Sequence, residues 1–260
     1  MYPESQKYRT GGTGDIISND GGSLASVYER GTKMGLEPLD YGDTSLVGYW
    51  TFDEGQGSTA YDYSGSGDNG SFVGSPVWQT STCKLQGCID FTSTGANYVS
   101  VPATSSLDIT NNLTISTWVK GNILSPSGGS VHLINKWNGT TYANYVLYYC
   151  GSACGSNDVF RWYANIGGTW SNMNGYSPLI STGTWNYISI VYSNNGAQMY
   201  WNGLPNGAPT SYGGGLLATS SSNLNIGDDA AVQDFSIDDV RIYNRALSAS
   251  EIQAMYNGNK

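Results

Sequence analysis

From residue 46 onward, the chain is a succession of short runs of β-branched and aromatic residues that turn-forming residues separate. Runs of about four to eight such residues, bounded by Gly, Pro, Asn, Asp or Ser, are typical of β-strands. The pattern predicts eleven strands, at 47–52, 88–91, 98–101, 113–120, 132–136, 145–149, 159–165, 185–192, 198–201, 223–226 and 236–243. Their number and spacing predict an all-β fold, a two-sheet antiparallel jelly-roll sandwich.

Two local motifs add detail to this fold. Asn194-Asn-Gly196 predicts a hairpin, because Asn and Gly tolerate the positive φ of tight turns. Ser248 followed by Glu251 has the spacing of a capping box and predicts a short C-terminal helix. Alternation divides the side chains of each strand between two faces. It does not say which face packs against the other sheet.

The composition favours one large β domain preceded by an extension. The 260 residues include 35 Gly, 20 Tyr and 8 Trp, which suits many short strands and turns. We expect the jelly roll to span 45–260. Residues 1–44 are Gly-rich and weakly patterned, with one possible short helix at 23–34, and we expect them to pack on the sandwich or lead to it. No apolar run approaches the roughly 18 residues of a membrane span, so we expect no membrane insertion by this segment.

The charge balance excludes polyanionic partners. Eleven basic and 20 acidic residues give a net charge of −9 and a sequence pI near 4.3. Such a chain repels phosphate backbones and anionic lipid surfaces, so nucleic acid is not an expected partner. Only 12% of the residues are charged, a composition that we associate with extracellular and cell-surface β domains.

The four cysteines fall as two close pairs. Cys83 and Cys88 form one pair, and Cys150 and Cys154 form the other. In an extracellular protein this spacing predicts two local disulfides. The alternatives are four free thiols in a reducing compartment, or a zinc site. The sole histidine, His132, leaves no mixed Cys/His ligand set for zinc.

Carboxylates near both ends of the jelly roll predict a metal site. If 47–53 runs antiparallel beside 236–243 with Trp50 opposite Val240, Asp53 falls near Asp238, and Asp62 returns in the loop between them. Three carboxylates together with the carbonyl groups of a Gly-rich loop suit calcium, which takes six to eight oxygen ligands. The alternative is that Asp62 caps a turn and Asp238 faces solvent.

The same two segments carry a family resemblance. Tyr49-Trp-Thr-Phe-Asp-Glu-Gly55, Asp62-Tyr-Ser-Gly65 and Ile237-Asp-Asp-Val-Arg-Ile-Tyr-Asn-Arg-Ala-Leu247 resemble the laminin-G-like, pentraxin-like jelly rolls of the concanavalin A-like lectin and glucanase fold. The resemblance implies a structural calcium held by the first loop and the last strand. Residues 1–44 loosely resemble the region after the N-terminal helix of pilin-like proteins, which implies self-assembly through a preceding segment.

Aromatic and amide side chains suggest a sugar site. Flat rings stack on sugar faces while Asn side chains bind the hydroxyls. We expect the ligand-binding rings to be Trp137, Trp162 and Trp170. The interleaved amides are Asn135, Asn138, Asn165, Asn172 and Asn174. The alternative is that these rings fill the core of the sandwich.

Catalysis finds little support in the sequence. A retaining glycosidase needs two carboxyl groups about 5–5.5 Å apart, and residues 45–260 contain only two glutamates, Glu54 and Glu251. We therefore expect a non-catalytic, calcium-stabilised carbohydrate-binding or adhesion module whose partner is a glycan or a surface protein. The alternatives are a structural display domain of a pilus-like assembly, without a small-molecule ligand, and a glycoside hydrolase.

Overall fold

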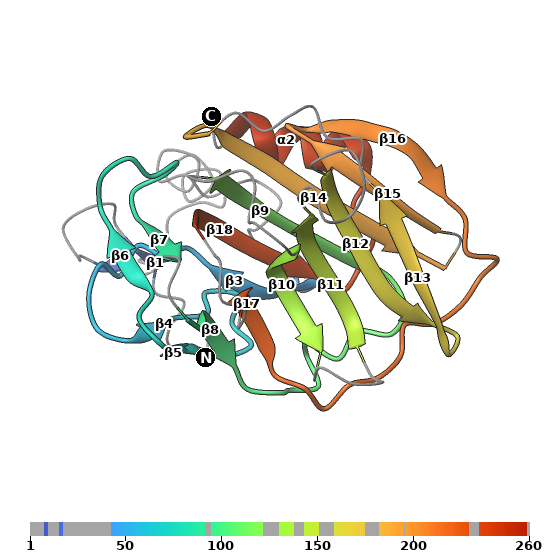
Figure 1. The fold of residues 1–260 in the computed structure, drawn as a ribbon, viewed down its shortest axis with the longest axis horizontal. Helices are drawn as coiled ribbons and strands as arrows, with labels where there is room; N and C mark the ends of the chain where they lie inside the picture. Colours follow the sequence, from blue (N-terminus) through green and yellow to red (C-terminus); the bar gives the residue numbers. More distant parts are fainter. Residues whose placement is uncertain are drawn as a thin grey trace.

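The computed structural model describes residues 8–9, 16–17, 43–91, 95–121, 130–137, 143–150, 159–174, 182–194, 196–228 and 234–258. Two antiparallel eight-stranded sheets pack face to face, and one helix, α2 (Ala249–Gly258), follows the last strand (Figure 1). The predicted jelly-roll sandwich with a short C-terminal helix is confirmed. The short strands β1 (Tyr8–Arg9) and β2 (Ile16–Ile17) pair with each other. The possible helix at 23–34 lies outside the described residues.

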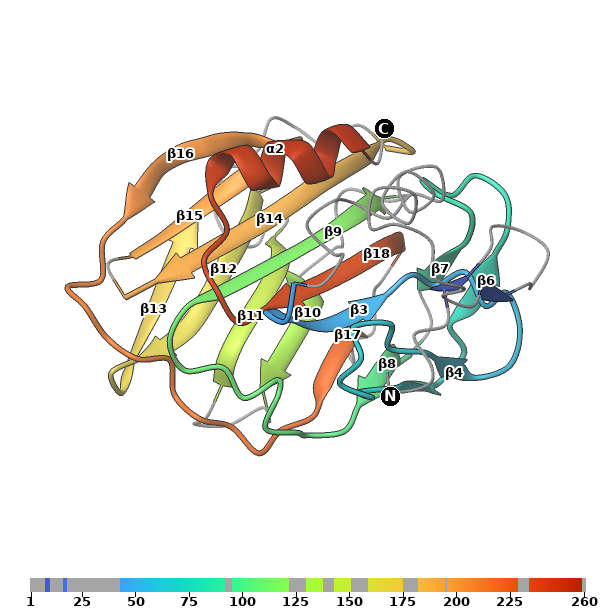
Figure 2. The same cartoon turned by 180° about the vertical axis from the view of Figure 1, so that it is seen from behind.

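One sheet, the helix-covered sheet, has its outer face buried under α2 (Figure 2). Its strand order is β16 (Leu204–Thr210), β15 (Gly196–Trp201), β14 (Trp185–Ser193), β9 (Leu113–Gly121), β18 (Phe235–Tyr243), β7 (Cys88–Phe91) and β6 (Val77–Gln79), with β3 (Leu46–Trp50) also paired to β18. Trp118, Tyr187 and Tyr243 on this face pack with Ile252 and Met255 of α2.

The other sheet, the opposite sheet, lies in front in Figure 1. Its strand order is β13 (Thr169–Asn174), β12 (Val159–Ile166), β11 (Ala143–Cys150), β10 (Ser130–Trp137), β17 (Leu224–Asp228), β8 (Asn97–Val101), β5 (Gly70–Val73) and β4 (Thr59–Ala60). Its inner face and that of the helix-covered sheet share one apolar core. In the described ranges no helix is both long and apolar enough to span a membrane.

All eleven predicted strands are present, and the register predicted for the first and last of them is confirmed. Trp50 lies opposite Val240 in the β3–β18 pair. Within the two large sheets, the sequence did not predict β4, β5, β6, β13 and β16, and the separate pair of β1 and β2 was not predicted either. Four of the five missed strands in the large sheets lie at their edges. Edge strands are less buried and need no strict apolar alternation, so their pattern is weak.

Both local motifs are also confirmed. Ser193 lies opposite Gly196 in the β14–β15 hairpin. At the start of α2, the backbone N–H of Ser248 donates to Glu251 Oε2 at 2.7 Å, and the N–H of Glu251 donates to Ser248 Oγ at 3.3 Å. This reciprocal pair satisfies backbone donors that the first helical turn leaves free.

Candidate functional site

Five aromatic side chains lie on the outer face of the opposite sheet. We call them the aromatic strip: His132 and Trp137 on β10, Tyr148 on β11, Tyr163 on β12 and Trp170 on β13. Tyr163 faces outward because its neighbours Trp162 and Ala164 face the core, and successive residues of a strand point to opposite faces. All five side chains are partly exposed.

The rings of the aromatic strip contact one another across the four strands. Tyr163 and Trp170 stack with ring centroids 4.6 Å apart and planes 7° apart. Trp170 meets Trp137 edge to face at a centroid distance of 6.4 Å. His132 extends the path to Trp137 and to Tyr148, with 6.0 Å between centroids in each case. Both geometries are favourable for aromatic pairs, so the rings support one another as a continuous surface.

The structure brings together two of the three predicted tryptophans and separates the third. Trp137 and Trp170 belong to the aromatic strip, whereas Trp162 is 0% exposed and packs in the core against Tyr192. The expectation that Trp162 binds a ligand is therefore wrong, because its side chain lies between the sheets. Its place on the outer face is taken by Tyr163, which the sequence interpretation missed.

The predicted amides divide in a similar way. Asn165 lies on the outer face directly opposite Trp170 and is 7% exposed. Asn135 is also buried, and its Oδ1 accepts a hydrogen bond from the backbone N–H of Trp137 at 3.2 Å. Asn138 and the side chains of Asn172 and Asn174 lie outside the described residues.

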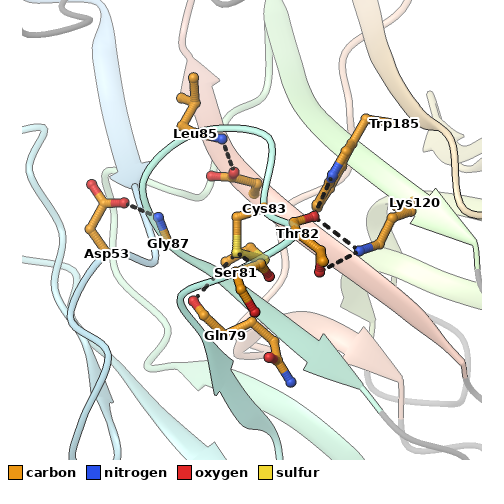
Figure 3. The surroundings of a disulfide bond; sticks show 11 residues. Asp53, Gln79, Ser81, Thr82, Cys83, Leu85, Gly87, Lys120 and Trp185 are labelled. Carbon is orange, nitrogen blue, oxygen red and sulfur yellow. Dashed lines mark hydrogen bonds between the residues drawn. A yellow bond between two sulfur atoms is a disulfide. The ribbon is translucent and has the colours of Figure 1, made fainter.

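A second group of polar residues surrounds a disulfide at one end of the helix-covered sheet (Figure 3). Cys83 and Cys88 are joined, as predicted, with Cα atoms 5.4 Å apart. The backbone N–H of Gly87 in this loop donates to Asp53 Oδ1 at 2.7 Å. A Cβ at Gly87 would lie 2.7 Å from the carbonyl oxygen of Phe52, so this close approach requires glycine.

Asp238 lies on the other side of the same loop and is completely buried. Its Oδ2 accepts a hydrogen bond from the N–H of Leu85 at 2.8 Å. In the part of the chain that the structure describes, its Oδ1 has no hydrogen-bond partner. Burial, followed by the neighbouring carboxylates of Asp239 and Asp53, raises the pKa of Asp238 well above its usual range. Asp239 is buried beside Arg241, with 3.1 Å between its Oδ1 and the guanidinium Nη2.

Asp62 does not join Asp53 and Asp238. Its Oδ1 accepts from the backbone N–H groups of Tyr49 and Ser64, and its Oδ2 accepts from Ser64 Oγ and the N–H of Asp68, all at 2.9 Å. The alternative role of Asp62 as a turn cap is therefore the one observed, whereas a solvent-facing Asp238 is excluded by its burial. Within the described ranges, no three His, Cys, Asp or Glu side chains are arranged to hold a metal.

The disulfides can be tested directly. Cys150 is disulfide-bonded, and its predicted partner Cys154 lies outside the described residues, so that pairing stays a prediction. Mass spectrometry of unreduced peptides should find Cys83 linked to Cys88 and Cys150 linked to Cys154. Replacing Cys83 and Cys88 with Ser should lower the free energy of unfolding by about 2 kcal/mol, the entropy expected for so short a loop. Free thiols or crossed links in the wild type would contradict the prediction.

Comparisons with known proteins agree with this architecture. The laminin G-like family model of the concanavalin A-like lectin/glucanases superfamily matches residues 93–253, more than half of the chain. No curated protein matches the chain in sequence.

Several solved structures share the fold. The binding domain of Paraclostridial Mosquitocidal Protein 1 aligns with a TM-score of 0.66 and 17% identity over 82% of this chain and 52% of its own. Domain 4 of AbnA, a GH43 extracellular arabinanase from Geobacillus stearothermophilus, aligns with a TM-score of 0.61 and 18% identity over 82% of this chain and 98% of its own.

The botulinum neurotoxin serotype D ligand binding domain aligns with a TM-score of 0.63 and 18% identity over 83% of this chain. The present chain spans about half the length of the two toxin domains, at 52% and 51%. At these identities the likeness shows the fold, and the family follows from the sequence model. The chain belongs to the concanavalin A-like lectin/glucanases superfamily.

Proposed function

We propose that this chain is a non-catalytic carbohydrate-binding module that holds a glycan against the aromatic strip. The observation that carries the proposal is the continuous set of partly exposed rings centred on the stacked pair of Tyr163 and Trp170. Aromatic rings that gather on one face of a domain and keep part of their surface accessible are typical of interaction sites. Rings with one accessible face suit the apolar faces of sugars, and nearby amides suit their hydroxyl groups.

Similar folds support this proposal. The AbnA domain was solved in complex with arabinotriose, and the serotype D domain in complex with N-acetylneuraminic acid. Those ligands belong to those proteins. The AbnA domain is aligned over 98% of its own length, so its arabinotriose complex is the stronger support for a sugar-binding role of this fold. The disulfide between Cys83 and Cys88, together with the extracellular AbnA neighbour, supports an extracellular or cell-surface location.

The positions of the two jelly-roll glutamates support a non-catalytic role. Glu251 caps α2 on the helix-covered side of the sandwich. Glu54 lies in the loop after β3, and its Oε1 accepts a hydrogen bond from the N–H of Tyr61 at 3.0 Å. Neither belongs to the strands that carry the aromatic strip, where a glycosidase would need a pair of carboxyl groups facing the sugar.

The Trp170→Ala variant tests the proposed site. Removing this ring should weaken binding of the best oligosaccharide on a glycan array by about 1–3 kcal/mol, as for an aromatic anchor. Isothermal titration calorimetry would measure the change. Tyr61 is 50% exposed beside β4, at the far edge of the same sheet, so Tyr61→Ala should bind like the wild type. If no glycan binds the wild type, the proposal fails in favour of a surface-protein partner or a structural display domain.

We also propose that calcium stabilises the fold at the disulfide loop, with Asp53 and Asp238 as carboxylate ligands. The unpartnered, buried Oδ1 of Asp238 supports this assignment, because a cation would neutralise a charge that burial otherwise makes unfavourable. Phe52 and Asp239, which flank the two carboxylates, both have a left-handed backbone with φ of 57°. Strain of this kind concentrates at functional sites. Backbone carbonyl groups of the surrounding loops would complete an oxygen-rich site.

A further inference from the structure

Two asparagines lie close together at one end of the aromatic strip. Asn165 on β12 faces outward, because its neighbours Ala164 and Ile166 lie in the core. Asn144 on β11 lies at an irregularity of the β10–β11 register, next to Tyr145. Tyr145 and Ala164 are partners in the β11–β12 register, so the two asparagines lie one position further along the same pair of strands. They are 0% and 7% exposed, respectively.

Each of these amides has an oxygen without a partner among the described residues. In the described residues, neither Asn144 Oδ1 nor Asn165 Oδ1 accepts a hydrogen bond. The orientation of Asn144 is fixed, because its Nδ2 donates to Asp108 Oδ1 at 3.1 Å. The same Asp108 oxygen accepts from the backbone N–H of Ser220 at 2.8 Å. Buried acceptors that lack a donor are rare in native proteins and unfavourable. A ligand that brings hydrogen-bond donors would therefore satisfy these oxygens.

The indoles of Trp137 and Trp170 extend over these two strands. They are anchored on β10 and β13, which β11 and β12 separate. Three strand spacings amount to roughly 14 Å, yet the ring centroids are 6.4 Å apart. The two side chains therefore lean toward each other above the strands that carry Asn144 and Asn165. A ligand can exchange the edge contact between these rings for its own stacking contacts.

We propose that this end of the aromatic strip is a subsite for an uncharged sugar, with Asn165 as its specificity-determining acceptor. A sugar hydroxyl would displace the edge contact between the indoles and donate to Asn165 Oδ1, while the sugar ring lies against Trp170. The inference rests on the proposed function and adds the chemical class of the ligand.

The groups at this subsite decide between neutral and acidic sugars. Asp108, which accepts a hydrogen bond from Asn144, also interacts electrostatically with the buried ammonium group of Lys136, so its charge is partly balanced locally. The chain as a whole has a net charge of −9, and a sugar carboxylate would therefore meet long-range repulsion. It would also bring acceptors to a subsite whose unpartnered atoms are themselves acceptors. A neutral sugar brings hydroxyl donors instead.

The test has two steps. A glycan array should present neutral oligosaccharides, arabinotriose among them, beside counterparts that carry sialic or uronic acid. The wild type should bind neutral glycans and should bind each acidic counterpart at least tenfold more weakly. The best neutral ligand is then titrated into Asn165→Leu, which should bind about tenfold more weakly through loss of one hydrogen bond. The melting temperature of Asn165→Leu should stay equal or rise, because the substitution removes an unpartnered oxygen.

Asn225→Leu is the matched control. Asn225 on β17 also carries an oxygen without a partner in the described residues, but β10 and β11 separate β17 from β12. This variant should bind as the wild type does. Preference for acidic glycans, or wild-type affinity in Asn165→Leu, would overturn the inference and leave the Trp170 result intact. If the wild type binds no glycan at all, the proposed function is refuted, and so is this inference.

Discussion

Replacing Trp162 with Ala should lower the free energy of unfolding by about 3–5 kcal/mol, the usual result of deleting a large buried aromatic side chain. Trp162 is 0% exposed and packs between the sheets, with its ring centroid 5.3 Å from that of Tyr192 and 6.1 Å from that of Tyr212. Its removal would leave a cavity that rigid strands on both sides cannot fill.

Trp170→Ala is the matched comparison for Trp162→Ala. The two tryptophans lie on adjacent strands, β12 and β13, but on opposite faces of the same sheet. Because Trp170 is partly exposed, its replacement should change the free energy of unfolding by less than about 1 kcal/mol. Urea denaturation followed by circular dichroism would measure both variants. Equal losses would show that Trp170 is a core residue and would count against the aromatic strip as a binding surface.

Replacing Asp238 with Asn should have opposite effects with and without calcium. In EDTA the variant should unfold with a free energy about 1–3 kcal/mol higher than the wild type, since a buried carboxylate with one unpartnered oxygen becomes neutral. The raised pKa of Asp238 also predicts that the wild type is the less stable of the two in EDTA. A group that binds its proton more tightly when folded makes the fold less stable as pH rises above the ordinary carboxyl pKa, and Asn does not titrate. The difference in free energy of unfolding between Asp238→Asn and the wild type in EDTA should therefore become smaller as the pH is lowered.

Added calcium should make the wild type more stable than Asp238→Asn. Binding to the folded state alone adds about 2.7 kcal/mol when the free ion is about 100 times its dissociation constant, and Asp238→Asn should lose that gain. Thermal melts in EDTA and in calcium would measure it. Asp62→Asn is the control: Asp62 accepts three hydrogen bonds within its own loop and one from Tyr49 on β3, so its replacement should lower stability and leave the calcium response intact. If the melting temperature of the wild type is the same in EDTA and in added calcium, the calcium site is refuted.

The features that the sequence determined are those that depend on neighbours along the chain. Strand alternation, the hairpin at Asn194-Asn-Gly196, the capping box of Ser248 and Glu251, and the Cys83–Cys88 disulfide were all predictable and are all observed. The pairing of Trp50 with Val240 was predictable as well. It joins distant segments, but each is a strand with recognisable carboxylates within it or just after it, and the register is fixed once two such strands are aligned.

The tertiary structure alone decided which face of each strand became the core. Alternation places Trp162 and Tyr163 on opposite faces, but a period of two has two equivalent phases, and only packing against the second sheet buries Trp162 and exposes Tyr163. The carboxylates follow the same logic. Asp62 and Asp238 are residues of the same type, yet Asp62 is held by its own loop and by Tyr49 of β3, whereas Asp238 is buried beneath the loop of Cys83 and Cys88. Burial and hydrogen-bond partners are set by segments far apart in the chain, so residue type and spacing could propose these sites but could not choose among them.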